Sequence, residues 1–200
     1  MRRERVAGRA AVDASSGPAL ADLDEPRLVE ACLDGRPGAF DLIVERHRRA
    51  VYQLCYRFVG NHEDARDLSQ DVFLRAYRGL ASFRGGSALS TWLYRIGVNL
   101  CLNQVSRKTL PSEAIDAQQH IDTRSESASD RVLREERGLH VRRAIALLPP
   151  KQRATLILRM YHELSHEEIA AVLGSSVGAV KANFFHALAN LKKRLGEGAV

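Results

Sequence analysis

The stretch Ser165–Leu195, SHEEIAAVLGSSVGAVKANFFHALANLKKRL, decides the fold because it contains two short helices around a tight turn. Ser165 and Glu168 have the spacing of a capping box, in which each side chain accepts a hydrogen bond from the other residue's backbone N–H. Gly174 is then placed to end the first helix in a left-handed conformation. The stretch therefore predicts a helix-turn-helix.

The second helix of this pair has an apolar stripe and a polar face. Ser175 or Ser176 can cap it. Its apolar residues recur at intervals of three and four: Val177, Val180, Phe184, Ala187 and Leu191. The opposite face carries residue types that bind phosphates and base edges, near the end that enters the major groove: Lys181, Asn183 and His186. A helical hairpin with solvated charges is the alternative.

The composition favours an all-helical protein with an anionic partner. Leu, Ala, Arg and Glu dominate the 200 residues, a length that allows one large or two small domains. A net charge of +6 and a pI near 9.5 favour nucleic acid, although 24 acidic residues make the surface mixed. No apolar run approaches the roughly 18 residues that span a bilayer, so we expect a cytoplasmic protein without membrane insertion.

The cysteines and one histidine motif need separate interpretation. Cys32, Cys55 and Cys101 lie far apart in apolar patterns and predict reduced, buried thiols, with a redox sensor as the alternative. His162–His166 reads HELSH, a formal match to the zinc-protease pattern, which requires both imidazoles on one helix. Because Ser165 is better placed as a cap, these residues should cross a helix boundary. We expect no metal, no cofactor and no catalytic activity.

Earlier helices are predicted from their caps and periodicity. Residues 1–22 show no periodicity and predict a disordered tail. Asp24 can cap a helix that ends at Gly35, and a longer amphipathic helix follows up to Gly60. His47 lies on the apolar stripe of that longer helix, where a half-buried structural histidine is expected.

A third helix has an outward row of acids and an amide. Asn61 can cap it, and its sequence is EDARDLSQDVFLRAYRGL. The expected buried side is Ala65, Leu68, Val72, Phe73, Ala76, Tyr77 and Leu80. The expected outward row is Asp64, Asp67, Gln70, Asp71 and Arg75. Such a row is typical of a solvated face, but it can also dock a helical partner.

An aromatic loop follows this helix. Gly85 and Gly86 interrupt the helical pattern, and the resulting loop holds Phe83, Arg84 and Ser87. Ser90 or Thr91 can then cap the next helix, which reads TWLYRIGVNLCLNQVSRK. The polar side of that helix is Arg95, Asn99, Asn103, Arg107 and Lys108. Together these groups offer a stacking surface, phosphate contacts and base-edge donors for single-stranded nucleic acid.

The periodicity stops at an acidic segment and then resumes. Residues 109–130 carry five acids against Arg124 alone and predict a linker. Beyond it, a helix ends at Pro149, and Pro150 starts another helix. The stripe of that helix is Ala154, Leu156, Ile157, Met160 and Tyr161. The predicted organisation is a tail (1–22), a helical domain (23–108), the linker (109–130), a second helical domain (131–195) and a short tail (196–200).

Two segments together carry a family resemblance: DARDLSQDVFLRAYRGLASFRGGSALSTWLYRIGVN in the first domain and ALLPPKQRATLILRMYHELSHEEIAAVLGSSVGAVKANFF in the second. From about Pro26 to Leu195 the chain resembles the extracytoplasmic-function class of bacterial sigma-70-family factors. The resemblance implies two small helical domains, sigma-2 and a helix-turn-helix sigma-4, joined by a flexible linker. It also implies that the chain binds core RNA polymerase and directs promoter-specific initiation.

The resemblance implies roles for particular residues of sigma-2, which in the family docks the coiled coil of the largest polymerase subunit and melts the minus-10 element. The polymerase-binding set would be Asp67, Gln70, Asp71 and Phe73. The strand-opening set would be Phe83, Arg84, Ser87, Trp92, Arg95 and Asn99. Extracting a base costs a few kcal/mol, which an amide such as Asn99 could recover through base-edge hydrogen bonds.

For sigma-4, the resemblance implies that the domain binds the polymerase flap and reads the minus-35 element of promoter DNA. The minus-35 set would be Ser176, Lys181, Ala182, Asn183 and His186. Of these, Lys181, Asn183 and His186 lie where relatives often carry arginine or serine. The acidic linker would follow the RNA exit path. Members of the class are commonly held inactive by an anti-sigma factor, so one is expected here as well.

Two other functions are compatible with parts of the sequence. A stand-alone helix-turn-helix regulator would bind duplex DNA without entering polymerase, but it needs neither the docking helix nor the aromatic loop. A zinc hydrolase would require stoichiometric metal at the HELSH motif.

Overall fold

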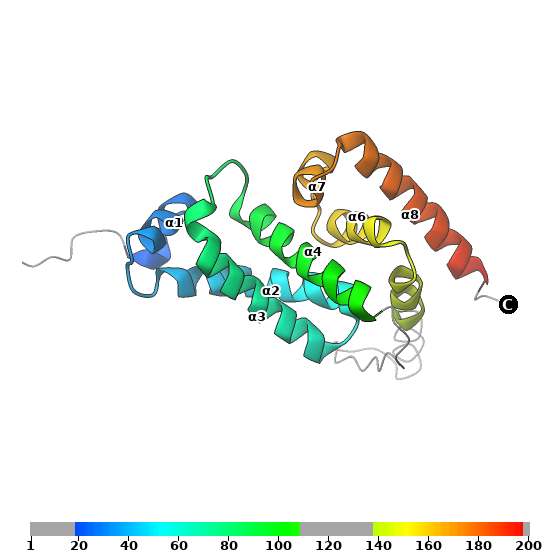
Figure 1. Cartoon of the computed structure of the whole chain (residues 1–200), viewed down its shortest axis with the longest axis horizontal. Coiled ribbons are helices and arrows are strands. Elements are labelled where there is room, and N and C mark those ends of the chain that lie inside the picture. The colour runs from blue at the N-terminus through cyan, green and yellow to red at the C-terminus, as the bar shows by residue number, and fades with distance from the viewer. Residues whose placement is uncertain (1–18, 109–137, 198–200) are drawn as a thin grey trace, which may run out of the picture.

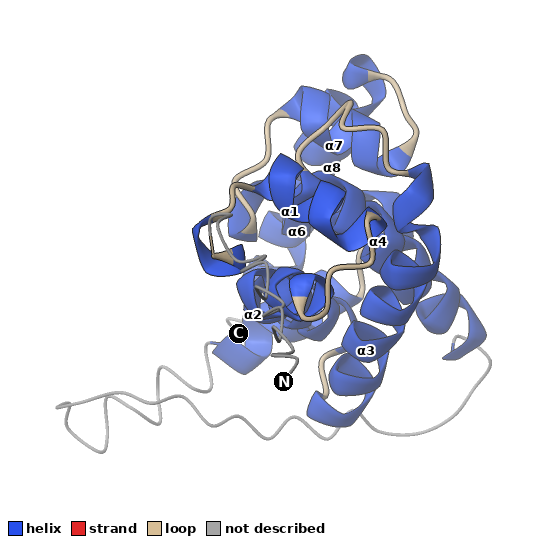
Figure 2. Ribbon diagram, turned by 90° about the vertical axis from the view of Figure 1, so that its left-hand side faces the viewer, coloured by secondary structure: helices blue, strands red, loops and turns tan. Residues whose placement is uncertain are grey.

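The computed structural model describes residues 19–108 and 138–197, which form helices joined by loops and contain no strand (Figures 1 and 2). The N-terminal part contains η1 (Leu20–Asp22), α1 (Glu25–Leu33), α2 (Ala39–Val59), α3 (His62–Gly79), η2 (Leu80–Ser82) and α4 (Leu89–Lys108). The C-terminal part contains a helical segment over residues 138–146, then α6 (Pro150–Tyr161), α7 (His166–Leu173) and α8 (Val177–Glu197). The all-helical prediction is confirmed. Most of the predicted tail and the whole predicted linker lie outside the described residues.

The predicted caps of the N-terminal helices are confirmed. The backbone N–H of Arg27 donates to the Asp24 carboxylate over 3.0 Å, and that of Asp64 donates to Asn61 Oδ1 over 2.8 Å. Gly60 ends α2 with φ 78°, in the left-handed region that glycine adopts without a steric penalty. These local signals fix where α1, α2 and α3 begin and end.

The capping box of α7 is also present. The N–H of Glu168 donates to Ser165 Oγ over 3.1 Å, and the N–H of Ser165 donates to the Glu168 carboxylate over 2.7 Å. Gly174 ends the helix with φ 58°. As predicted, the HELSH motif crosses a helix boundary, because α6 ends at Tyr161 and α7 begins at His166.

The N-terminal core forms where α2 packs between its neighbours. Its fully buried residues include Ile43, Val51, Leu54 and Phe58 from α2, Ala65 and Val72 from α3, and Leu93 and Val98 from α4. Cys55 and Cys101 are buried, as predicted, whereas Cys32 is half-buried, and all three are free thiols. This core holds α3 and α4 in fixed positions, each with one face outward.

Three details of the predicted pattern were wrong. Tyr77 is 66% exposed, because its ring meets the Phe40 ring of α2 only in an edge contact that leaves most of the side chain open to solvent. Met160 is 58% exposed, although it continues the expected stripe of α6. Helix α4 begins at Leu89, so Thr91 lies inside it and is buried instead of capping it.

A glycine sets how closely α4 crosses α2. A Cβ atom on Gly97 would lie 2.9 Å from Leu54 Cδ2 and 3.5 Å from Val72 Cγ2. Carbon atoms in contact are normally about 3.5–4.0 Å apart, so no larger side chain fits without moving the core.

The two parts of the chain pack against each other through α4 and α7 and through α2 and α6 (Figure 1). We call this contact the domain seam. Its specific contacts join Arg57, Phe58, Tyr94 and Arg95 on the N-terminal side to Arg153, Tyr161, His162 and Ala171 on the C-terminal side. No helix among the described residues has the length and apolar character of a membrane span.

Gly97→Val should destabilise the protein by roughly 1–3 kcal/mol, because the added methyl groups overpack the α2–α4 crossing. The free energy of unfolding measured in urea checks this value. Gly178→Ala is the control, since a Cβ there meets nothing within 4 Å and α8 should gain a few tenths of a kcal/mol to about 1 kcal/mol. Equal stability of Gly97→Val and wild type would contradict the steric argument.

Candidate nucleic-acid and polymerase interface

Helix α3 presents an acidic and partly apolar face to solvent. Asp67, Gln70 and Asp71 are exposed, at spacings of three and four residues that place them on one side of the helix. The same side carries Leu74, which is 54% exposed, and Tyr77. Neither residue was predicted from the sequence, because the apolar period of α3 places Tyr77 on the buried side and Leu74 lies outside that period. Their exposure on a helix that otherwise buries its apolar side is the signal for a docking surface.

Phe73 differs from the other proposed polymerase-binding residues. It is half-buried and packs against the N-terminal core, so its side chain lies away from the row of Asp67 and Asp71. In this position it holds α3 in place, while Leu74 offers the exposed apolar surface.

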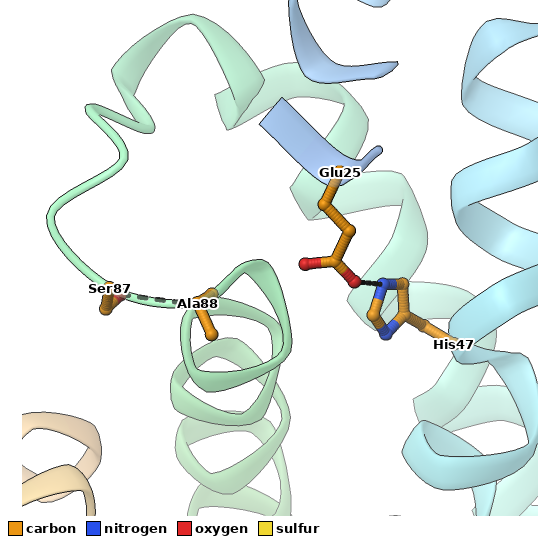
Figure 3. Close-up of polar contacts among 4 residues, drawn as sticks. All are labelled: Glu25, His47, Ser87 and Ala88. Carbon is orange, nitrogen blue, oxygen red and sulfur yellow. Dashed lines mark hydrogen bonds and ion pairs between the residues drawn. The ribbon is translucent and has the colours of Figure 1, made fainter. Parts of the chain in front are cut away.

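The aromatic loop is held against α3 and α4. The Phe83 ring lies 5.4 Å from the Trp92 ring, and the Trp92 ring edge would be 3.7 Å from a Cβ on Gly79. Ser87 is half-buried, and its hydroxyl donates to the Ala88 carbonyl over 3.4 Å (Figure 3). Arg84 is exposed. The loop therefore presents a basic side chain beside a tilted aromatic pair.

A histidine–carboxylate contact joins α2 to the start of α1. His47 Nε2 on α2 is 2.9 Å from the carboxylate of Glu25, the first residue of α1 (Figure 3). Burial lowers the pKa of His47, and the nearby Glu25 carboxylate only partly opposes that effect. His47 is thus the structural histidine that the sequence predicts.

On α4, two polar residues of the strand-opening set share one side. Arg95 and Asn99 are both exposed and lie one helical turn apart. They differ in their contacts, because Arg95 Nη2 donates to the Ala171 carbonyl of α7 over 2.7 Å. The structure brings Phe83 and Trp92 together and places Arg95 at the domain seam.

The outward face of α8 carries basic, small and apolar side chains. Ser176 acts as its cap, with its Oγ accepting from the N–H of Ala179 over 3.2 Å. Lys181, Ala182 and His186 are exposed, and Asn183 is half-buried. The missed residue is Phe185, whose 69% exposure and position beside the His186 ring put it on the same outward surface.

Two contacts with aromatic rings at the domain seam involve residues whose sequence pattern does not predict them there. His162 lies 4.7 Å from Tyr94, ring centre to ring centre, and the Arg57 guanidinium lies 4.1 Å above the Tyr161 ring. Burial lowers the pKa of His162 to about 4, and the nearby Arg57 charge adds to the effect. Within the described part of the chain, no group of three or more His, Cys, Asp or Glu side chains could hold a metal ion.

Both parts of the chain match known protein families. Residues 43–110 match the family described as Sigma-70 region 2, and residues 139–191 match Sigma-70, region 4. The RNA polymerase sigma-H factor of Pseudomonas aeruginosa is 37% identical over 185 residues, which cover 88% of this chain and 96% of that protein. The chain is an extracytoplasmic-function sigma factor of the sigma-70 family.

Other relatives agree with this assignment. The ECF factor SigW of Bacillus subtilis is 35% identical over 171 residues, covering 80% of this sigma factor and 91% of SigW. The ECF sigma-E factor of Escherichia coli K12 is 38% identical over 174 residues, covering 82% and 91%. This sigma factor is therefore a transcription initiation factor with a DNA-binding helix-turn-helix, and not an enzyme. The membership decides against both the stand-alone regulator and the zinc hydrolase.

Solved structures share the fold. CnrH, in complex with the cytosolic domain of CnrY, superposes on this sigma factor with a TM-score of 0.64 at 27% identity, covering 86% of this chain and 96% of CnrH. RpoE of Bartonella quintana, in complex with the anti-sigma factor NepR, gives a TM-score of 0.63 at 23% identity, covering 80% and 98%.

The stability of the sigma factor should depend on His162 below pH 6.5. Because the folded protein lowers this pKa from 6.5 to about 4, the neutral imidazole is favoured in the folded state. The stabilisation is complete above pH 6.5 and is lost as the pH falls from 6.5 toward 4, by about 2 kcal/mol at pH 5. Urea unfolding at pH 7.5 and pH 5 tests this. His162→Gln should remove that part of the pH dependence, and identical pH dependence in the two proteins would refute it.

Proposed function

We propose that the outward face of α3 docks this sigma factor onto core RNA polymerase. The proposal rests on the exposed row of Asp67, Gln70 and Asp71 beside Leu74 and Tyr77. Carboxylates and an amide next to apolar side chains suit a basic, partly apolar helical surface such as the coiled coil of the largest subunit. Phe73 supports this face from below.

We propose further that the loop and α4 open the minus-10 element. The Phe83 and Trp92 rings form an apolar wall, beside which Arg84 and Ser87 can contact the DNA backbone. Asn99 is exposed and carries both a donor and an acceptor for a base edge. One of the five N–H donors of Arg95 is held by the Ala171 carbonyl, so the full use of its guanidinium on DNA away from α7 requires release from Ala171.

The minus-35 element is proposed to be read by the outward surface of α8. Lys181 supplies charge for a phosphate, Ala182 is small enough for close approach, and Asn183 and His186 can bond base edges. Ser176 fixes the start of the helix, so its side chain is already in use as a cap. The polymerase flap is the proposed second partner of this domain.

Regulation by an anti-sigma factor is the remaining part of the proposal. It is supported by the likeness to CnrH, which was solved with the cytosolic domain of CnrY. Residues 109–130 lie outside the described residues, and their acidic sequence supports a path along the RNA exit channel. The cytoplasm is the proposed site of action, because core polymerase and promoter DNA are there.

Asp71→Lys should weaken binding to core polymerase by about tenfold or more, because it places a cation where the partner surface is proposed to be basic. Fluorescence anisotropy of the labelled sigma factor with core enzyme measures the affinity. Glu45→Lys is the control, because Glu45 is an exposed acid on α2 outside this face. Contacts of the C-terminal part with promoter DNA should not change, because Asp71 lies on α3 in the N-terminal part. If Asp71→Lys and Glu45→Lys lost the same affinity for core polymerase, the effect would come from net charge alone and the proposed docking face would be wrong.

Asn99→Ala should slow promoter opening while leaving core binding unchanged, because it removes only the base-edge hydrogen bonds. Run-off transcription of fragmented genomic DNA with core polymerase first identifies a promoter. Permanganate reactivity of its unpaired thymines then gives the opening rate, with an expected loss of about tenfold or more. Asn103→Ala is the control, since Asn103 is an exposed amide one turn further along α4. If the Asn99→Ala variant opened the promoter at the wild-type rate, Asn99 would not belong to the proposed site.

A further inference from the structure

A cavity at the domain seam is bordered by four arginines. It lies between the C-terminal end of α2, the helical segment 138–146 and the start of α6, and its volume is about 30 Å³. The arginines are Arg57, Arg142, Arg143 and Arg153. No aspartate or glutamate lines the cavity, and no ion pair of these four arginines is found among the described residues. Four positive charges therefore meet at this place without an acidic partner in the described structure.

Several hydrogen-bond donors around the cavity have no acceptor. Arg153 is only 6% exposed, and two of its nitrogens donate to the carbonyls of Phe58 and Ala146. Its Nε has no partner, and the same is true of Arg142 Nε and the Tyr56 hydroxyl. All three of these groups belong to residues that line the cavity. Buried donors left without acceptors are costly, and more so when they carry charge.

The end of α2 explains only part of this arrangement. The carbonyl end of a helix attracts cations, and Arg153 bonds directly to the Phe58 carbonyl there. A helix end carries a partial charge of about −0.5, however, which is small against four guanidinium groups. Water could satisfy the donors but would bring no negative charge.

We propose that this cavity is a binding site for one small oxyanion of the phosphate class. Guanidinium groups match phosphate and carboxylate oxygens with paired N–H donors, and such an anion only accepts hydrogen bonds, as these donors require. The cavity is larger than the roughly 10–15 Å³ that one water needs, which suits a single oxyanion and excludes a whole nucleotide.

The site spans both parts of the chain, so its occupancy is linked to how they sit together. Arg57 belongs to α2, whereas Arg142 and Arg153 belong to the C-terminal part. An anion bound by both parts stabilises the arrangement in which Arg95 donates to Ala171, because it binds that arrangement and not the separated parts. The oxyanion thus acts against use of Arg95 on DNA.

Titration of the full chain with inorganic phosphate tests the site, because it needs neither polymerase nor promoter. Ionic strength is held constant with sodium chloride, and the Tm and the ³¹P line width are followed. We expect saturable line broadening and a Tm rise of roughly 3–5 °C at ten times Kd. Arg142→Gln should weaken binding about tenfold or more. Arg48→Gln is the matched control, because Arg48 is an exposed arginine of α2 that does not line the cavity.

The outcomes separate the site from general charge effects. A phosphate response that is equal in wild type and Arg142→Gln, or equal to that of chloride, overturns the proposal. If Arg142→Gln lowers the helical circular dichroism signal, Arg57→Gln takes its place as the test variant. A parallel titration with acetate distinguishes the source: a response to both anions assigns oxyanions in general, and a response to phosphate alone assigns phosphate.

Discussion

The burial of α2 is the constraint on which the rest of the structure depends. This helix contacts α1, α3 and α4, and its last turn also contacts α6. Its apolar residues fill the N-terminal core, so the outward faces of α3 and α4 are fixed by what they must present to α2. Gly97 shows how tight this arrangement is, because the α2–α4 crossing leaves no space for a Cβ. The surfaces proposed for polymerase and for the minus-10 element are therefore the outward faces of two helices, α3 and α4, that pack on α2.

Much of the helical architecture could be predicted from the sequence, because the residues that begin and end each helix act locally. Asp24, Asn61 and Ser165 cap the helices that follow them, and Gly60 and Gly174 end helices where glycine is required. Capping needs only a side chain and a backbone N–H three residues away, so spacing suffices to find it. The two segments that carry the family resemblance lie entirely within the residues matched to Sigma-70 regions 2 and 4.

What could not be predicted depends on contacts between distant residues. Tyr77 continues the apolar period of α3, but its contact with α2 is limited to the edge of the Phe40 ring, so it stays exposed. Phe185 sits between lysine and histidine on α8, and nothing in its spacing shows whether another helix covers it. Arg153 is charged yet buried, since its acceptor is the Phe58 carbonyl, 95 residues away in sequence. Periodicity identifies which side of a helix is apolar, but the seam decides which polar groups are also covered.

The hydrogen bond from Arg95 to Ala171 makes α7 a competitor for a side chain proposed to contact DNA. Both partners belong to one chain, so the contact has an effective concentration that dilution of the protein does not lower. Promoter DNA is a separate molecule, so the fraction of sigma factor molecules whose Arg95 contacts DNA rises with the DNA concentration. Polymerase can change this balance without touching Arg95, by holding the C-terminal helices elsewhere. The availability of this arginine is then decided by where the second part of the chain is bound.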